Sequence, residues 1–272
     1  MRARAFITQK QAESEADCQD RFSINAANGA VAVSDGMSQS LFPKCWAEIL
    51  AEKYTSERDW FPSRENVQAL APLWREKVEQ RMDLMRSAGM DPWRSEMMLE
   101  EGASAGATLV GLRTNGSTWT CDILGDSCLI ELEGNRIKEI YSSMDHFGSY
   151  PDYFDGNPSN PGKGIVRTVT GAWNPPDPAL FPQTTLLLVT DALGEFLSSI
   201  KGTPEESTRI RELLSVESAD EFKMLVEYWR KDGMHNDDTT LVVVTDDYWW
   251  MGESRVSPNP GDCFKRQEEW VW

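Results

Sequence analysis

The chain has 272 residues, of which 40% are hydrophobic and 26% are charged, and its formal net charge is −17. This length supplies the core of one large domain or two small ones, and a surface this acidic excludes nucleic acid and anionic membranes as partners. The five cysteines are scattered and odd in number, so they form neither a disulfide framework nor a CxxC metal motif. No apolar run approaches the roughly 20 residues that cross a bilayer, and the N-terminus lacks the apolar region of a secretory signal. We therefore expect a cytoplasmic protein, and we take it to be a single-domain monomer.

The first part of the chain predicts paired strands followed by helices. Residues 2–8 and 21–35 alternate as strands do, and an Asn-Gly turn divides the second range into a hairpin. Apolar residues then recur every three or four positions over 45–57 and 65–89, which predicts two helices.

The middle of the chain predicts a meander and then an irregular stretch. Four strand-like segments follow one another with short turns between them: 104–113, 117–126, 127–134 and 136–142. From 142 to 181 the chain is rich in Pro, Gly, Asn and Asp and has no regular period. A stretch of that length in a compact domain is usually a functional flap, or else it is disordered.

The last part predicts a strand that runs into a helix over 183–197, an amphipathic helix over 217–233 and a core strand over 236–246. The remainder, 247–272, is rich in tryptophan and has no regular pattern, so we interpret it as a tail that packs on the domain or on a partner. The whole order predicts an α+β fold, a two-sheet β-sandwich with α-helices on both outer faces.

Acidic residues stand at the ends of several predicted strands. Five positions share this placement: Asp20, Asp35, Asp126, Asp191 and Asp237. Each alone is typical of a turn or cap, but three of them adjoin the most hydrophobic strands, and carboxylates at the rim of a core are costly unless a cation pairs them. Carboxylate oxygens with water are the ligands that Mg²⁺ or Mn²⁺ prefers. Gly36 fits the same site, because a residue without Cβ lets its carbonyl approach a metal closely.

Six motifs in chain order carry a family resemblance: CQDRF, VAVSDGM, GATLVGL, LGDSCLIEL, LLLVTDALGEFL and NDDTTLVVV. Their order and spacing resemble the signature of the metal-dependent protein phosphatases of type 2C. The resemblance implies a four-layer α-β-β-α catalytic domain over 1–246, with a flap over about 142–181 beside the site, and a separate tail over 247–272. It also implies a phosphoprotein substrate. Proteins that a cognate Ser/Thr kinase phosphorylates are candidates for that substrate.

The resemblance also implies a role for each acidic residue. Asp35 would bridge two Mg²⁺ or Mn²⁺ ions, the Gly36 carbonyl would bind one of them, and Asp191 and Asp237 would complete the binuclear site. The two other carboxylates match a third-metal ligand and a group that orders water at the metals: Asp126 and Asp20. The implied reaction is the hydrolysis of phosphoserine or phosphothreonine by a water that two cations activate.

Some positions depart from the family pattern. The family commonly places an arginine that holds the substrate phosphate four residues before its (E/Q)D pair, and here that position is Glu15. Arg4 or Lys10 could substitute for it. Other motif arginines or glycines are replaced at three places: Cys128, Ala192 and Ser38-Gln39. The intact metal ligands favour an active phosphatase over a pseudo-phosphatase that acts as a regulatory binding module.

A serine hydrolase is a weaker alternative. Residues 102–106 read GASAG, which fits the GxSxG nucleophile elbow, and Ser104, Asp191 and His235 follow the chain order of a hydrolase triad. An elbow needs a strand before it and a helix after it, whereas this sequence predicts a helix and then a strand. His235 as a metal ligand, and His146 as a ligand or general acid, are hypotheses that loop positions alone would explain.

Overall fold

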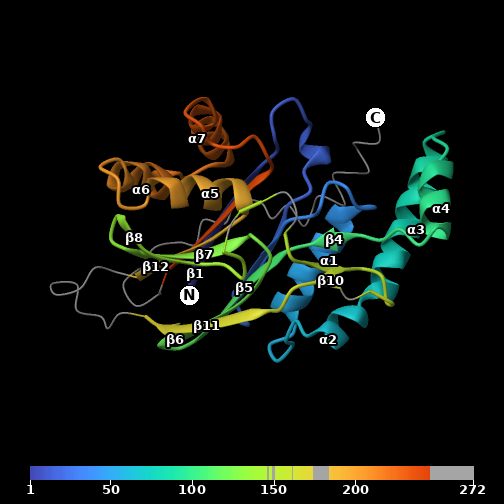
Figure 1. The fold of residues 1–272 in the computed structure, drawn as a ribbon, viewed down its shortest axis with the longest axis horizontal. Coiled ribbons are helices and arrows are strands. Elements are labelled where there is room, and N and C mark those ends of the chain that lie inside the picture. The colour runs from blue at the N-terminus through green and yellow to red at the C-terminus, as the bar shows by residue number, and fades with distance from the viewer. Residues whose placement is uncertain (146, 149–150, 161, 174–183, 246–272) are drawn as a thin grey trace.

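The computed structural model describes residues 1–145, 147–148, 151–160, 162–173 and 184–245. Two larger antiparallel sheets stack on each other, and helices lie outside both (Figure 1). No helix in these ranges is long and apolar enough to span a membrane.

The strands pair as follows. The first sheet has the order β1 (Arg2–Thr8), β13 (Thr239–Thr245), β12 (Thr184–Val189), β7 (Cys128–Glu133) and β8 (Arg136–Tyr141). The second sheet has the order β11 (Arg167–Ala172), β6 (Thr118–Leu124), β5 (Leu109–Asn115), β3 (Ala30–Ser34) and β2 (Arg21–Asn25). A smaller sheet has the order β10 (Gly162–Lys163), β9 (Tyr153–Asp155) and β4 (Gly106–Ala107).

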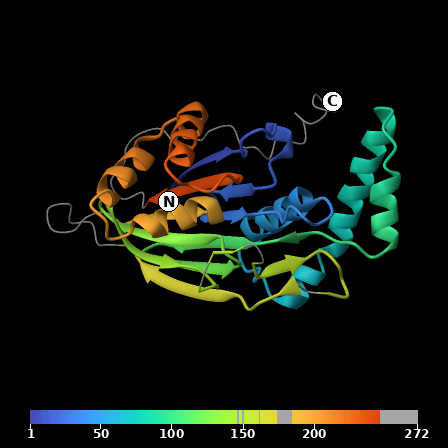
Figure 2. The ribbon, with the colours of Figure 1, turned by 45° about the horizontal axis from the view of Figure 1, so that its top comes forward.

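Two groups of helices cover the sandwich (Figure 2). The first sheet is covered by α5 (Asp191–Ile200), α6 (Glu206–Ser215) and α7 (Ala219–Lys231). On the side of the second sheet lie α1 (Pro43–Ser56), α2 (Arg64–Gln68), α3 (Ala71–Ser87) and α4 (Trp93–Glu100). A short 3₁₀ helix, Glu15–Asp17, lies in the connection from β1 to β2.

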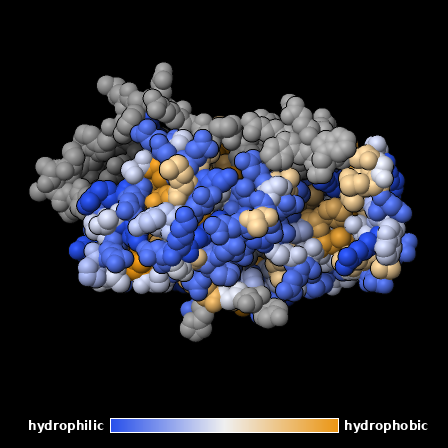
Figure 3. Space-filling view, turned by 90° about the horizontal axis from the view of Figure 1, so that it is seen from above, coloured by the Kyte–Doolittle hydropathy of each residue, from blue (hydrophilic) through white to orange (hydrophobic). Residues whose placement is uncertain are grey.

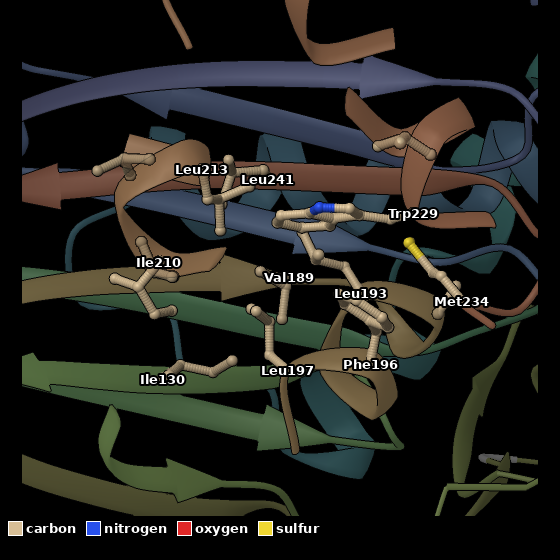
Figure 4. Close-up of a cluster of buried hydrophobic side chains, with 14 of the residues drawn as sticks. Ile130, Val189, Leu193, Phe196, Leu197, Ile210, Leu213, Trp229, Met234 and Leu241 are labelled. Carbon is tan, nitrogen blue, oxygen red and sulfur yellow. The ribbon is translucent and has the colours of Figure 1, made fainter. Parts of the chain in front are cut away.

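Three apolar cores separate these four layers. One lies between the first sheet and its helices, where Trp229 of α7 stacks on Phe196 of α5 with ring centroids 5.0 Å apart (Figure 4). A second lies between the two sheets, and a third lies between the second sheet and α1. The predicted α+β sandwich with helices on both outer faces is therefore confirmed.

The alternation of side chains explains why the central strands are apolar throughout. Successive residues of a strand point to opposite faces of the sheet. In β13, Leu241 and Val243 contribute to the core under α5–α7, whereas Val242 and Val244 contribute to the core between the sheets. Because both faces are buried, the strand reads as an unbroken apolar run, and only its ends are free to carry polar side chains.

The structure differs from the prediction in three places. The helix predicted over 65–89 is divided into α2 and α3, because Pro72 lacks the backbone N–H that a helix interior uses and stands instead in the first turn of α3. Helix α6 was not predicted. Strands β9, β10 and β11 lie within the stretch 142–181 that the sequence predicts to be irregular. The tail 247–272 lies outside the described residues.

Candidate metal centre

Strand register brings Asp20 and Asp35 together. Asp20 immediately precedes β2 and Asp35 immediately follows β3, and these strands pair with Arg21 opposite Ser34. The two aspartates therefore extend from neighbouring strand ends of the second sheet.

The first sheet brings three more carboxylates to the same end of the sandwich. Val189, the last residue of β12, pairs with Cys128 of β7 on one side and with Leu241 of β13 on the other. The carboxylates that adjoin these strand ends are Asp126, Asp191 and Asp237. The charges of all three, and that of Asp20, raise the pKa of Asp35, so five predicted site residues interact electrostatically at one rim.

Burial and mutual repulsion make these carboxylates hard to ionise. Burial is the largest cause of the raised pKa of Asp35, and the other carboxylates add to it. Burial raises the pKa of Asp126 to about 6, with a contribution from Asp237. Burial and the charges of Asp126 and Asp237 raise the pKa of Asp191 to about 7. Divalent cations would offset the cost of burial and the repulsion between the carboxylates, because they pair with the negative charges and replace the lost hydration.

Asp20 is held by two threonines through one oxygen only. Thr190 and Thr240 donate their hydroxyls to Oδ2 of Asp20, at 2.9 and 2.8 Å. Oδ1 of Asp20 is buried and has no partner among the described residues, and the same holds for Oδ1 of Asp126. A buried carboxylate oxygen without a donor is costly, so both atoms suit a site that a cation or an ordered water completes.

Thr108, of the GATL motif, holds the loop that carries Asp35. Its Oγ1 accepts the backbone N–H of Asp35 at 3.1 Å, and its own N–H donates to the carbonyl of Asp35 at 2.9 Å. The same Oγ1 lies 2.7 Å from the hydroxyl of Ser127, in the turn that also carries Asp126. The sequence motifs contain Thr108 and Ser127, but only the structure shows that they join the loops that carry Asp35 and Asp126.

Gly36 lies in a space that admits no side chain. A Cβ built on it would meet the carbonyl carbon of Pro43 at 2.9 Å and the carbonyl oxygen of Gln19 at 3.0 Å. Glycine is therefore required here by close packing between the DGM loop, α1 and the loop before β2.

The adjacent pair Asp237 and Asp238 divides into two environments. Asp238 is buried and accepts the backbone N–H groups of Lys10 and Gln19 at 3.0 and 2.8 Å, so it ties the loop between β1 and β2 to the start of β13. Asp237 is partly exposed, and its Oδ1 lies 3.4 Å from Nζ of Lys10. Asp237, the predicted ligand, therefore lies at the rim of the sandwich with the other predicted site residues.

Of the three positions considered for the phosphate grip, only Lys10 lies beside the carboxylates. Arg4 donates to the carbonyls of Leu214 and Val216 at the end of α6, so it is committed elsewhere. Glu15 is exposed in the short 3₁₀ helix.

The hydrolase alternative finds no support in the geometry. The hydroxyl of Ser104 bonds to Asp155, a residue of the smaller sheet, and not to His235, which is exposed. The chain around Ser104 runs from α4 into β4, which is the reverse of the strand-to-helix order of an elbow. His146 lies outside the described residues.

The donor set fits magnesium or manganese, although it is not drawn together. As placed, no group of three or more His, Cys, Asp or Glu side chains in the described part of the chain could hold a metal ion. The donors are all oxygens and two of them are buried without partners, which is the chemistry that hard divalent cations require.

Comparison with known proteins places the fold. No protein-family model matches the chain, and no curated protein matches its sequence. Solved structures do match. The catalytic domain of the serine/threonine protein phosphatase PstP in complex with two manganese ions is 16% identical, with a TM-score of 0.54, over 89% of this chain and 96% of that one. The chain has the fold of the type 2C phosphatases.

Two other structures with this type 2C fold match over similar lengths. The photosystem II phosphatase PBCP is 14% identical, with a TM-score of 0.54, over 90% of this chain and 98% of that one. PppA, a key regulatory component of T6SS in Pseudomonas aeruginosa, is 17% identical, with a TM-score of 0.52, over 90% of this chain and 97% of that one. These likenesses extend over nearly the whole chain and establish the fold, while the site rests on the geometry described above.

Proposed function

We propose that the chain is a metal-dependent phosphatase that hydrolyses phosphoserine and phosphothreonine in proteins. The observation that carries the proposal is the placement of five interacting carboxylates, each at a different strand end, along one rim of a type 2C fold. Their raised pKa values support it further, because an electrostatic strain of this kind is typical of functional sites.

Four residues would hold two Mg²⁺ or Mn²⁺ ions: the carboxylates of Asp35, Asp191 and Asp237 and the carbonyl of Gly36. Asp126, with its unpartnered oxygen, would hold a third ion. Bound there, the cations would lower the pKa of the attacking water and neutralise charge on the phosphoryl oxygens. The catalytic domain would then comprise residues 1–246, with the stretch 142–181 acting as a flap.

The remaining residues would orient the reactants. Asp20, fixed by two threonines through Oδ2, presents Oδ1 as an acceptor for a proton of the attacking water. Thr108 fixes the backbone of Asp35 from both sides. Lys10 takes the place of the family arginine, since it is the cation beside Asp237 and can turn to the substrate phosphate once a metal neutralises that carboxylate.

A regulatory binding module is the second candidate. It is favoured by Glu15, which puts a negative charge where the family pattern has the arginine that grips phosphate. Such a module would bind cations through the same carboxylates but would not turn over a phosphoester.

Hydrolysis of p-nitrophenyl phosphate with Mn²⁺, with Mg²⁺ and with EDTA tests the proposal. We expect turnover that requires the cation and falls by about 10²-fold or more in Asp35→Asn and in Asp191→Asn, because each variant removes a ligand charge at the reacting centre. Asp59→Asn is the matched control, since Asp59 is exposed and distant in sequence from every motif. Cation binding without turnover of this ester or of phosphopeptides would favour the binding module.

A further inference from the structure

The first turn of α1 carries a lysine whose side chain is largely withdrawn from solvent. Lys44 follows Pro43, whose carbonyl carbon packs against Gly36, so the backbone of Lys44 lies beside the candidate metal loop. Its Nζ donates to the carbonyl of Ala16, in the short 3₁₀ helix, at 2.7 Å. No carboxylate of the described residues forms an ion pair with this ammonium group, and an ammonium has two further protons to donate.

Helices α1 and α3 pack together and are joined by ion pairs. Lys77 of α3 bonds to Glu48 of α1 at 2.7 Å and lies 3.9 Å from Glu52. One turn earlier on α1 stands Lys44, and one turn later on α3 stands Arg81. Residues four apart share a helix face, and the charge of Arg81 lowers the pKa of Lys44, so a cation faces a cation beside the Lys77 ion pairs.

Near Lys44, Arg21 adds a third positive charge. It is only 6% exposed and donates to the carbonyls of Cys18 and Asp20, which fixes the loop before β2. Burial first, and then the charges of Arg21 and Arg81, lower the pKa of Lys44 to about 8. The charge of Asp17 raises the pKa of Lys44 by a smaller amount, and this carboxylate accepts both the backbone N–H and the hydroxyl of Ser14.

Within the described part of the chain, Arg21, Lys44 and Arg81 form no ion pair, which is unexpected in a protein whose net charge is −17. Like charges that are partly desolvated destabilise a fold unless a ligand of opposite charge joins them. An anion is therefore the group that this arrangement lacks. An oxyanion suits it best, because guanidinium and ammonium groups donate charge-assisted hydrogen bonds to carboxylate and phosphate oxygens.

We propose that Lys44 and Arg81 form an anion subsite beside the metal centre, which binds an oxyanion-bearing side chain near the phosphoresidue of the substrate. This inference rests on the proposed phosphatase function. It explains how so acidic a protein can accept an acidic substrate. The subsite selects phosphoproteins that carry a glutamate, an aspartate or a second phosphorylated residue close to the one that is hydrolysed.

Steady-state kinetics on three phosphopeptides test the subsite in the full-length protein with Mn²⁺. The peptides differ only at the positions next to the phosphoserine, which carry Glu, a second phosphoserine or Gln. For the wild type we expect kcat/KM about 10-fold higher with at least one of the two anionic peptides than with the Gln peptide, mainly through a lower KM. Whichever of the two anionic peptides has the higher kcat/KM identifies the carboxylate or the phosphate as the preferred group.

Lys44→Gln and Arg81→Gln should each bring the ratio of kcat/KM between the anionic and Gln peptides close to one. Lys53→Gln, which changes a half-buried lysine near the other end of the same helix, should preserve that ratio. Both test variants should melt at or above the temperature of the wild type, because each relieves a like-charge contact. A preference that persists in both variants, or that is absent from the wild type, would overturn the subsite.

A second readout separates this inference from the proposed function. If no phosphopeptide or p-nitrophenyl phosphate is hydrolysed, the proposed function has failed, but the subsite can still be tested by anion binding in EDTA. We expect inorganic sulfate to raise the melting temperature of the wild type more than that of Lys44→Gln or Arg81→Gln. An equal rise in all three proteins would rule the subsite out.

Discussion

Asp237 and Asp238 are chemically identical neighbours with different environments. Asp238 uses each carboxylate oxygen to accept one backbone N–H of the loop between β1 and β2, whereas Asp237 faces the rim beside Lys10. At the level of single residues, the partners of each oxygen therefore separate a structural carboxylate from a candidate ligand.

The pair gives a matched experiment. Asp238→Asn keeps one acceptor and loses the other, so one buried N–H is left unsatisfied and the free energy of unfolding should fall by about 1–3 kcal/mol. Asp237→Asn should leave the melting temperature in EDTA unchanged or higher, but should weaken Mn²⁺ binding strongly. Thermal melts with and without Mn²⁺ distinguish the two, and an Asp237→Asn protein with wild-type affinity for Mn²⁺ would remove Asp237 from the site.

The raised pKa values predict how stability depends on pH when no metal is present. In the folded chain Asp191 has a pKa of about 7 and Asp126 one of about 6, and both are raised from 3.8. Between about pH 4 and pH 7, the folded state therefore holds protons on these two carboxylates that the unfolded state has released. Their contribution to the stability of the folded state is greatest below about pH 4 and is lost as the pH rises to about 7.

We expect the free energy of unfolding in EDTA to fall by a few kcal/mol over that range. For each carboxylate, every unit between its unfolded-state pKa and its folded-state pKa corresponds to about 1.4 kcal/mol. Asp191→Asn should flatten the slope and stabilise the metal-free protein at pH 7.5. Urea unfolding at several pH values measures this, and saturating Mn²⁺ should abolish the slope in the wild type. A slope that is the same in Asp191→Asn would contradict the assignment.

At the level of elements, the candidate site is a set of strand ends tied together by hydroxyl groups. Thr108 joins the loop after β3 to the turn between β6 and β7, and Thr190 and Thr240 join β12 and β13 to Asp20. These bonds fix carboxylates that would otherwise repel one another.

Replacing Thr108 by Val tests this framework at nearly constant volume. The hydroxyl bonds to the N–H of Asp35 and to Ser127 are lost, so we expect the free energy of unfolding to fall by about 1–3 kcal/mol. The kcat for p-nitrophenyl phosphate should fall about 10-fold or more, since small misplacements of catalytic groups are costly. Thr118→Val, on the exposed end of β6, is the control. A wild-type kcat in Thr108→Val would show that the hydroxyl does not position Asp35.

Some elements could be predicted from the sequence, and others could not, for physical reasons. β12 and β13 are buried on both faces, so their apolar runs stand out, and the acidic residues at their ends were recognisable as candidate ligands. β11 is an edge strand with exposed residues, so its sequence RTVTGA carries almost no apolar pattern. Thr190 and Thr240 carry no signal in the sequence, because only the folded arrangement shows that both reach Asp20.

At the level of the whole molecule, repulsion between acidic residues destabilises the folded state, and the packing of the apolar cores stabilises it. Hydrophilic residues cover most of the described part of the face seen in Figure 3, and the three apolar cores lie beneath. The tail 247–272 lies outside the described residues, so packing on the domain and docking a partner both remain predictions for it.

Truncation after Asp246 distinguishes these two roles. A tail that docks a partner predicts a folded truncated protein whose melting temperature stays within about 3 °C of the full-length value, because a small change in stability shifts a domain of this size by only a few degrees. Its turnover of p-nitrophenyl phosphate should equal that of the intact chain. Unfolding or insolubility of the truncated protein would show instead that the tail completes the domain.

Calorimetric titration of the metal-free protein with Mn²⁺ at pH 7.5 tests the central claim most directly. The account predicts at least two ions bound per chain, release of protons from the carboxylates of raised pKa, and loss of most binding in Asp35→Asn, since that carboxylate would bridge both ions. Binding of no ion, or an unchanged stoichiometry and affinity in Asp35→Asn, would contradict the account.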